Sequence, residues 1–225
     1  MKLLAVVVVL VGGFWLWTNH ERHALEHRLG GVASELAGRK VGVKCQGFWA
    51  AMVDIQERIG DVQFTNGRAG NSMFLTRGVC GHLRSFSSHR SHHDIDCLET
   101  IDWSTWSLEN DFDAPCERHA RPTVEAINTL THESMHLRGF ISESQAQCYA
   151  IELDAWTVMR LGGTEAEGDA VAAYLLALQP ALPDDYQSAN CRAGGAYDLW
   201  PATAAFPSES PPQLPPPTLI GQAAA

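Results

Sequence analysis

The spacing of hydrophobic positions divides the chain into three stretches. Near the N-terminus, every residue from 3 to 17 is apolar or glycine. In the central part, apolar residues recur mostly at the spacing of helices that bury one face. Near the C-terminus, the chain is rich in proline and has no periodic pattern of apolar residues. We therefore predict a signal anchor or signal peptide (1–18), a folded domain (19–202) and a Pro-rich disordered tail (203–225).

In the first half of the domain, segments with helical spacing alternate with short β-like runs. Helical spacing is found over residues 20–40, 48–59 and 76–86. The β-like runs are 41–45, 62–64 and 73–76. The last two runs flank Asn66-Gly67, a residue pair typical of a tight hairpin turn because both positions accept a positive φ. We expect a small antiparallel sheet in this region.

Two long helices are predicted on either side of Gly139. The first contains Pro122, which suits the first turn of a helix because its missing N–H would have no partner there. Gly139 then ends this helix. Ser142 is a good N-cap for the second helix, which runs to about Leu161, and a capping box at Thr164 opens a third. The whole pattern predicts a mostly helical α+β domain with the small sheet beside two adjacent helices.

Charge and cysteine content narrow the class of protein. The formal net charge of -10 argues against nucleic acid as a partner, because phosphate binding needs a basic surface. The six cysteines are an even number, which in an exported protein indicates disulfides. We predict that Cys97 pairs locally with Cys116 and that the other four cross-link more distant elements. The protein is then extracytoplasmic, either anchored in the membrane by its N-terminal segment or secreted.

The sequence His132-Glu133-Ser134-Met135-His136 carries the most specific chemistry in the chain. Residues four apart share one face of a helix, so the two imidazoles converge on one point. This spacing is typical of a zinc ion with two nitrogen ligands and with the intervening Glu beside the open coordination position. Catalytic zinc usually has three protein ligands. Glu143 is the candidate for the third, because the short loop after Gly139 folds the second helix back beside the first.

These residues resemble a known family of enzymes. H-E-x-x-H followed by E-x-x-A on the next helix, here Glu143 and Ala146, resembles the gluzincin class of zinc metallopeptidases in its short-linker form. The stretch is also similar to uncharacterised exported bacterial proteins with the same motif. The resemblance to gluzincins extends from about residue 122 to residue 160 and does not cover the rest of the chain.

The resemblance implies a role for each matching residue. His132, His136 and Glu143 would bind zinc in a zincin-like domain, and Glu133 would be the general base for hydrolysis of a peptide bond. The class often has an Asp four residues after the third ligand, where it accepts a hydrogen bond from the first His. Gln147 stands at that position in this chain. Its carbonyl oxygen can accept the same bond, but without the charge that strengthens a ligand.

A second family pattern overlaps the same stretch. The sequence also resembles the metzincin motif H-E-x-x-H-x-x-G-x-x-H, with Gly139 in place. Ser142 stands where that motif requires its third His, and no later methionine turn supports it. We therefore prefer Glu143 over a third histidine as the remaining ligand.

Other polar residues are weaker candidates. His119 and Tyr197 are possible donors to an oxyanion, although a structural role explains either residue better. The triplet His92-His93-Asp94 contains metal-binding residue types, but adjacent side chains do not face one way in regular structure. The segment 87–116 around it is better interpreted as an inserted loop near the active site. Asp198 is more typical of a turn cap than of a residue that supports a metal ligand.

The sequence thus predicts an exported zinc metallopeptidase that acts on a peptide or protein substrate. One alternative is a non-catalytic, zinc-stabilised binding module of the cell envelope, or a degenerate peptidase that keeps the metal without turnover. A third possibility is an envelope interaction protein without a metal, which would require the motif to be accidental.

Overall fold

The computed structural model describes residues 2–47, 60–103, 105–112, 114–201 and 206–207, with side chains from Asn19 onward. The helix predicted over 48–59 and nearly all of the predicted tail lie outside the described residues, as do the side chains of the predicted signal anchor. In the part of the chain that the structure describes, no helix is long and apolar enough to cross a membrane.

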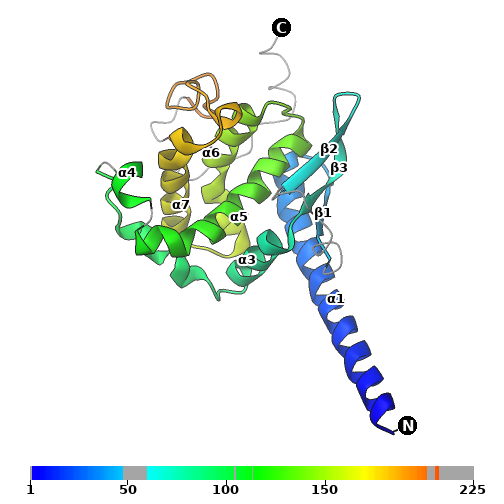
Figure 1. Ribbon diagram of the computed structural model, residues 1–225. Helices are drawn as coiled ribbons and strands as arrows, with labels where there is room; N and C mark the ends of the chain where they lie inside the picture. The colour runs from blue at the N-terminus through cyan, green and yellow to red at the C-terminus, as the bar shows by residue number, and fades with distance from the viewer. Residues whose placement is uncertain (1, 48–59, 104, 113, 202–205, 208–225) are drawn as a thin grey trace.

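The fold is mostly helical, with one small sheet, as predicted. The α-helices are α1 (Lys2–Ala37), α3 (Arg77–Ser87), α4 (Leu108–Asp111), α5 (Pro115–Arg138), α6 (Glu143–Leu161) and α7 (Glu165–Leu178). Short 3-10 helices are η1 (His92–Asp94), η2 (Asp96–Thr100), η3 (Gln179–Ala181) and η4 (Asp184–Tyr186). The strands are β1 (Gly42–Cys45), β2 (Gly60–Thr65) and β3 (Arg68–Leu75). In Figure 1 the sheet lies beside α1, and the N-terminal part of α1 projects away from the body of the molecule.

The sheet is mixed rather than antiparallel, and its strand order is β1-β3-β2. β2 and β3 are antiparallel about Asn66 and Gly67, which have φ angles of 51° and 73°, so the predicted hairpin is confirmed. β1 pairs with β3 in parallel, so the prediction of an antiparallel sheet is wrong in this respect. A turn signal fixes the pairing within a hairpin, but it does not specify which of the two strands a third one joins.

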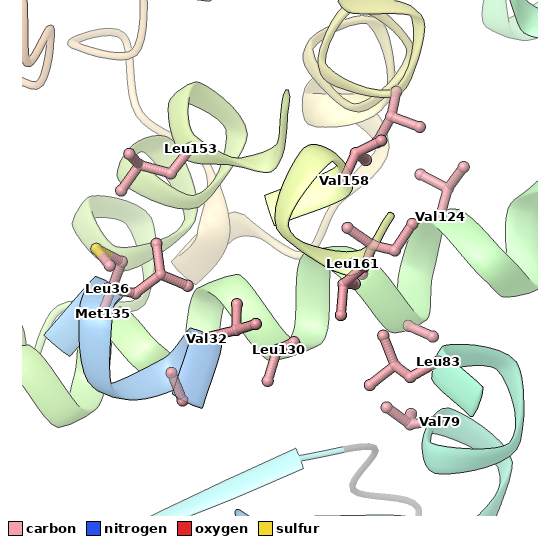
Figure 2. Close-up of a cluster of buried hydrophobic side chains, with 14 of the residues drawn as sticks. Val32, Leu36, Val79, Leu83, Val124, Leu130, Met135, Leu153, Val158 and Leu161 are labelled. Carbon is pink, nitrogen blue, oxygen red and sulfur yellow. The ribbon is translucent and has the colours of Figure 1, made fainter. Parts of the chain in front are cut away.

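Helix α5 is the centre of the helical layer, since it packs against α1, α3, α6 and β3. Figure 2 shows Leu130 and Met135 of α5 among apolar side chains from these neighbouring helices. These two side chains are 0% and 1% exposed. Burial of a side chain of this size stabilises a fold by roughly 1.5–3 kcal/mol. The packing therefore holds the polar residues of α5 in fixed positions.

The position of Pro122 differs from the sequence prediction. The helix begins at Pro115, and Pro122 lies in its interior. Pro115 already occupies the first turn, where a missing N–H has no consequence. Pro122 removes one hydrogen bond within the helix, at a cost of about 3 kcal/mol. Thr123 and Val124 next to it are 1% and 0% exposed, so tertiary packing offsets that cost.

Three disulfides fasten peripheral elements to the helices. They join Cys45 of β1 to Cys80 of α3, Cys97 of η2 to Cys116 of α5, and Cys148 of α6 to Cys191 in the C-terminal loop. The predicted local pair is confirmed, and the other four cysteines cross-link distant elements as expected. Disulfides persist in oxidising compartments, which favours an extracytoplasmic location.

The segment 87–116 packs against the helices and takes no part in the cleft described below. Trp106 donates a hydrogen bond to Glu117 at 3.0 Å. The rings of Trp103 and Trp106 lie 5.7 and 6.3 Å from the ring of Tyr174 in α7. None of the described residues of this segment lines the cleft, so the segment that we expected to be an inserted loop near the active site is a packing element instead. Trp103 and Trp106 are half-buried and pack against the core.

Candidate metal centre

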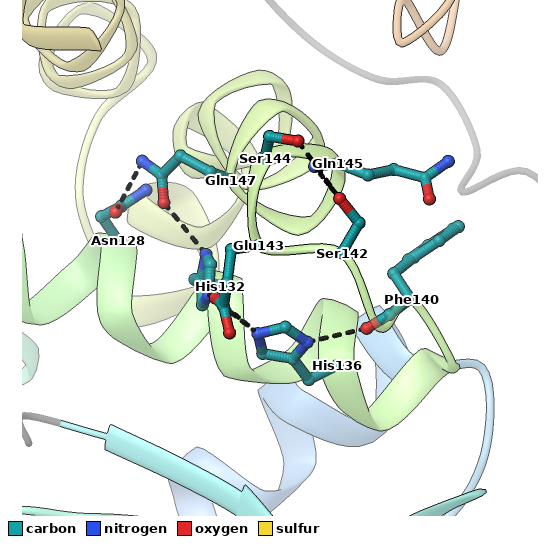
Figure 3. A network of polar contacts seen from close by, with 9 residues as sticks. All are labelled: Asn128, His132, His136, Phe140, Ser142, Glu143, Ser144, Gln145 and Gln147. Atoms are coloured by element: carbon teal, nitrogen blue, oxygen red, sulfur yellow. Dashed lines mark hydrogen bonds and ion pairs between the residues drawn. The ribbon is translucent and has the colours of Figure 1, made fainter. Parts of the chain in front are cut away.

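A short loop between α5 and α6 brings the predicted ligands together. α5 ends at Gly139, whose φ of 118° is a conformation that favours glycine. The Gly139 N–H donates to the carbonyls of Met135 and His136 at 3.2 and 2.9 Å. α6 then starts after Ser142, whose hydroxyl accepts a hydrogen bond from a backbone N–H in the first turn. The first residue of α6, Glu143, consequently lies opposite the last turns of α5 (Figure 3).

Three ligand atoms meet at one point between the two helices. The Nε2 atoms of His132 and His136 are 2.9 Å apart. Oε2 of Glu143 lies 2.9 Å from the first and 3.1 Å from the second. Both histidines are 5% exposed, whereas the side chain of Glu143 is 36% exposed, so the point is open to solvent on one side. Among the described residues, this is the group of His, Cys, Asp and Glu that could hold a metal ion.

The partners of the other ring nitrogens decide which atoms face the centre. Nδ1 of His136 lies 2.7 Å from the carbonyl oxygen of Phe140, which can only accept a hydrogen bond. Nδ1 of His132 lies 3.0 Å from Oε1 of Gln147. Each neutral ring therefore carries its proton on Nδ1 and turns an Nε2 lone pair towards Glu143 (Figure 3). Three lone pairs this close repel one another unless a proton or a cation lies between them, so the donor set fits a metal.

Electrostatics favour the metal-binding state of these groups. The close approach of the two imidazoles, that of His132 first, lowers the pKa of Glu143 to about 2, against the opposing effect of burial. Burial lowers the pKa of His132, because a charged imidazolium is poorly solvated there. Glu143 thus stays ionised, and His132 readily loses the proton with which a metal would compete.

Glu133 lies beside the same centre and is 8% exposed. Burial, followed by the negative charges of Glu143 and Asp61, raises its pKa to about 8. The start of β2 approaches it closely: a Cβ atom on Gly60 would be 2.8 Å from Cγ and Oε1 of Glu133 and from the methyl group of Thr129. Only glycine at position 60 leaves this carboxyl group its space.

The centre lies in a cleft of about 630 Å³ between the two helices and strand β2. Its lining residues are Gly60, Asp61, Val62, Phe64, Asn128, Thr129, His132, Glu133, His136, Ile141, Glu143, Gln147 and Tyr186. All four residues predicted to form the site are among them. The cleft is therefore a single site that contains the candidate ligands and the candidate base.

Tyr186 is a cleft residue that the sequence interpretation missed. Its ring stacks on that of His132, with centroids 5.5 Å apart. Burial and the nearby charge of Glu143 raise its pKa to about 12. No motif surrounds it in the sequence, since it reaches the site only through the path of the chain after α7.

The other sequence candidates lie elsewhere. His119 is bonded to the carbonyl of Pro115 at 2.6 Å, and Tyr197 packs against Tyr149, so neither lines the cleft. Asp198 accepts hydrogen bonds from the backbone of a C-terminal turn, which is the role that its residue type favoured. The triplet beginning at His92 forms no metal cluster, because His92 faces Glu167 while His93 and Asp94 face each other.

Comparisons with known proteins do not assign this site. No family model, curated protein or solved structure matches the chain. Function is therefore inferred from the geometry and chemistry of the metal centre.

Proposed function

We propose that the protein is an exported zinc metallopeptidase in which His132, His136 and Glu143 hold the metal. The observation that carries this proposal is the convergence of their three donor atoms, 2.9–3.1 Å apart, with each histidine Nδ1 bonded away from the centre. Two imidazoles and one carboxylate form a common set of protein ligands for catalytic zinc, whereas Ca²⁺ and Mg²⁺ prefer oxygen ligands alone. When bound, zinc supplies a water of lowered pKa and polarises the scissile carbonyl.

Glu133 is the residue that moves the proton. It follows His132 directly in the sequence and lines the same cleft. A pKa raised to about 8 by burial and acidic neighbours lies near neutral pH, where a group can both take up and return a proton. Glu133 therefore accepts a proton from the attacking water and gives it to the leaving amine.

Tyr186 is placed to stabilise negative charge on the substrate. Its hydroxyl lies near Glu143 at the mouth of the centre, and its pKa of about 12 keeps it protonated at physiological pH. A neutral hydroxyl held in position by ring stacking on His132 can donate a hydrogen bond to an oxyanion.

The walls of the cleft favour a peptide as the substrate. Among the described strands β2 pairs with β3 alone, and four of its residues, beginning at Gly60, line the cleft. An unpaired strand edge offers backbone N–H and C=O groups to an extended peptide. Phe64 and Ile141, which are 37% and 59% exposed, add apolar surface to the same cleft. A peptide with a hydrophobic side chain fits both features.

The decisive test replaces the proposed base. The wild type should contain one zinc ion per chain by elemental analysis and should cleave members of a peptide library. Glu133→Gln should lower turnover by about 10²–10⁴-fold while zinc stays bound, because general acid–base catalysis contributes that much. Glu125→Gln, on the same helix but outside the cleft, is the matched control and should keep full activity. Wild-type protein without zinc, or cleavage that survives Glu133→Gln, would refute the assignment.

A non-catalytic zinc module is the second candidate. Gln147 favours it, because an amide oxygen bonded to His132 strengthens the ligand less than a carboxylate would. This alternative predicts the same zinc content but no cleavage of any peptide by the wild type.

A further inference from the structure

A chain of hydrogen bonds connects His132 to a fully buried carboxyl group on α6. Nδ1 of His132 bonds to Oε1 of Gln147 at 3.0 Å, and Nε2 of Gln147 donates to Oδ1 of Asn128 at 3.1 Å (Figure 3). Nδ2 of Asn128 then donates to Oδ2 of Asp154 at 2.8 Å. Asp154 is 0% exposed. The chain thus runs from the metal centre into the interface between α5 and α6.

The carboxylate of Asp154 fixes the donor and the acceptor in every hydrogen bond of this series. A carboxylate can only accept hydrogen bonds, so Asn128 must turn its NH₂ group to Asp154 and its oxygen to Gln147. Gln147 must then turn its NH₂ group to Asn128 and its oxygen to His132. Because that oxygen can only accept, the neutral imidazole of His132 must carry its proton on Nδ1, which leaves Nε2 without one.

We propose that Asp154 is a positioning residue for the metal centre, which acts through Asn128 and Gln147 to keep the proton of His132 on Nδ1 and Nε2 free for the metal. The inference rests on the proposed function, because it assumes that this centre binds zinc. It also explains how a site with Gln147 in place of a carboxylate can still orient its ligand. The negative charge is present, but two amides separate it from the histidine.

The environment of Asp154 supports a role beyond packing. Its Oδ1 atom is buried without a hydrogen bond of normal geometry, although the Thr131 hydroxyl interacts with the carboxyl group. Burial raises its pKa to about 7. A buried carboxyl group that is only partly satisfied costs stability, and an apolar or amide side chain would avoid that cost. The residue is therefore poorly explained by stability alone.

The first test is Asp154→Asn, measured at pH 8, where the wild-type carboxyl group is ionised. An amide at this position can donate, so all three amides can turn over together and move the proton of His132 to Nε2. We expect zinc affinity to fall about 10–100-fold, the range for loss of a group that supports a ligand. Competition with a chromophoric chelator measures the affinity, and circular dichroism checks that the variant is folded.

A double variant tests the proposed route. Gln147→Glu in the Asp154→Asn background keeps the net charge and places the carboxylate directly against Nδ1 of His132. Asn128 can then donate to the new carboxylate and accept from the new amide, so its two bonds are reversed while His132 still donates from Nδ1. We expect this variant to regain wild-type zinc affinity.

Glu152→Gln is the matched control. Glu152 lies on the same helix and is 1% exposed, but both its oxygens face the backbone N–H of Leu199 at 3.1 Å, outside the chain of bonds. Zinc affinity should be unchanged in this variant. A similar loss of affinity in Glu152→Gln would show that any buried carboxyl on α6 matters, and it would overturn the proposal.

The remaining outcomes separate this inference from the proposed function. If wild-type protein binds no zinc, the proposed function fails. The inference is then decided by the ring tautomer of His132 in long-range ¹⁵N–¹H spectra of the full chain. That tautomer should be Nδ1–H in the wild type and shift towards Nε2–H in Asp154→Asn. An unchanged tautomer, unchanged zinc affinity in Asp154→Asn, or a loss that Gln147→Glu does not rescue would each overturn the role of Asp154.

Discussion

Two groups of His and Glu among the described residues differ in what their ring nitrogens face. At the metal centre, both histidines bond through Nδ1 to uncharged oxygens and turn Nε2 towards Glu143. In the second group, His92 lies 2.8 Å from Glu167 through Nδ1 and 3.1 Å from a backbone carbonyl through Nε2. Both ring nitrogens of His92 thus face acceptors inside the protein. The second group therefore turns neither nitrogen towards a point where a metal could bind.

The difference shows that residue types alone do not define a metal site. His92 also stacks on the ring of Phe86, with centroids 4.3 Å apart, and Glu167 completes the capping box of α7. All polar atoms of that pair have structural partners. At the metal centre, by contrast, Nδ1 of each ring has a hydrogen-bond acceptor, whereas Nε2 faces other lone pairs. A histidine is suited to bind a metal when one ring nitrogen has a hydrogen-bond partner in the protein and the other has none.

A third buried carboxyl group extends the comparison, because no histidine faces it. Burial raises the pKa of Glu152 to about 8, in spite of its hydrogen bond from Leu199. The pKa of Glu143, which faces two imidazoles, is instead about 2. The imidazoles that face Glu143 thus lower its pKa, whereas burial is the main cause of the raised pKa of Glu152.

The largest expected effect separates the two histidine groups by metal content. His136→Ala should lower zinc affinity by more than about 100-fold, since a direct ligand contributes more than the supporting residues that account for 10–100-fold. His92→Ala should leave zinc content unchanged. Chelator competition and elemental analysis measure both. Loss of zinc in His92→Ala would mean that the two groups are coupled.

A matched pair of Glu→Gln variants should distinguish the two histidine groups by their effect on the free energy of unfolding. Glu167→Gln should lower the free energy of unfolding by about 2–3 kcal/mol, because it removes the charge from a pair whose carboxylate side is 4% exposed. Glu143→Gln should change the stability of the zinc-free protein by much less, because its side chain is 36% exposed. Urea unfolding with chelator present measures both values. Equal losses would contradict the assignment of the first group as structural.

The smallest effect concerns Glu152 and pH. Its folded pKa of about 8 lies above the ordinary value of 4.5, so between these values the folded state binds more protons than the unfolded state. Stability then falls as pH rises through this window. Glu152→Gln removes this contribution, and the loss of stability between about pH 6.5 and pH 8 should shrink by about 1–2 kcal/mol. Thermal unfolding at the two pH values measures it, and an unchanged difference would show that Glu152 is ionised throughout.

Local signals predicted the two-helix unit around Gly139 well. Gly139, the Ser142 N-cap and the capping box at Thr164 act within one helical turn, and the structure has all three. The position of Glu143 followed from the same signals, because so short a loop leaves the second helix few ways to return. Gln145 stands three residues after Ser142, where the sequence pattern favours a capping box, but its side chain donates to the Tyr149 hydroxyl instead.

Residues that depend on tertiary contacts could not be predicted in this way. Tyr186 reaches the cleft from beyond α7, and Asp154 reaches His132 only through two side chains from different helices. The parallel pairing of β1 and the interior position of Pro122 are likewise decided by packing. Sequence patterns report a periodicity and a cap, but they do not report which distant side chain completes a hydrogen bond.

The bond between Cys148 and Cys191 gives the cleft a dependence on redox conditions. Cys148 lies on α6, and Cys191 follows Tyr186 by a few residues in the loop that leaves α7. The crosslink ties both ends of this loop to the helical body, so it raises the effective concentration of the Tyr186 ring at His132 without touching the centre. Reduction of this disulfide would lengthen the tether and lower the effective concentration of Tyr186 at His132, while His132, His136 and Glu143 stayed in place. The cleft would then contain Tyr186 in an oxidising compartment and lose it in a reducing one.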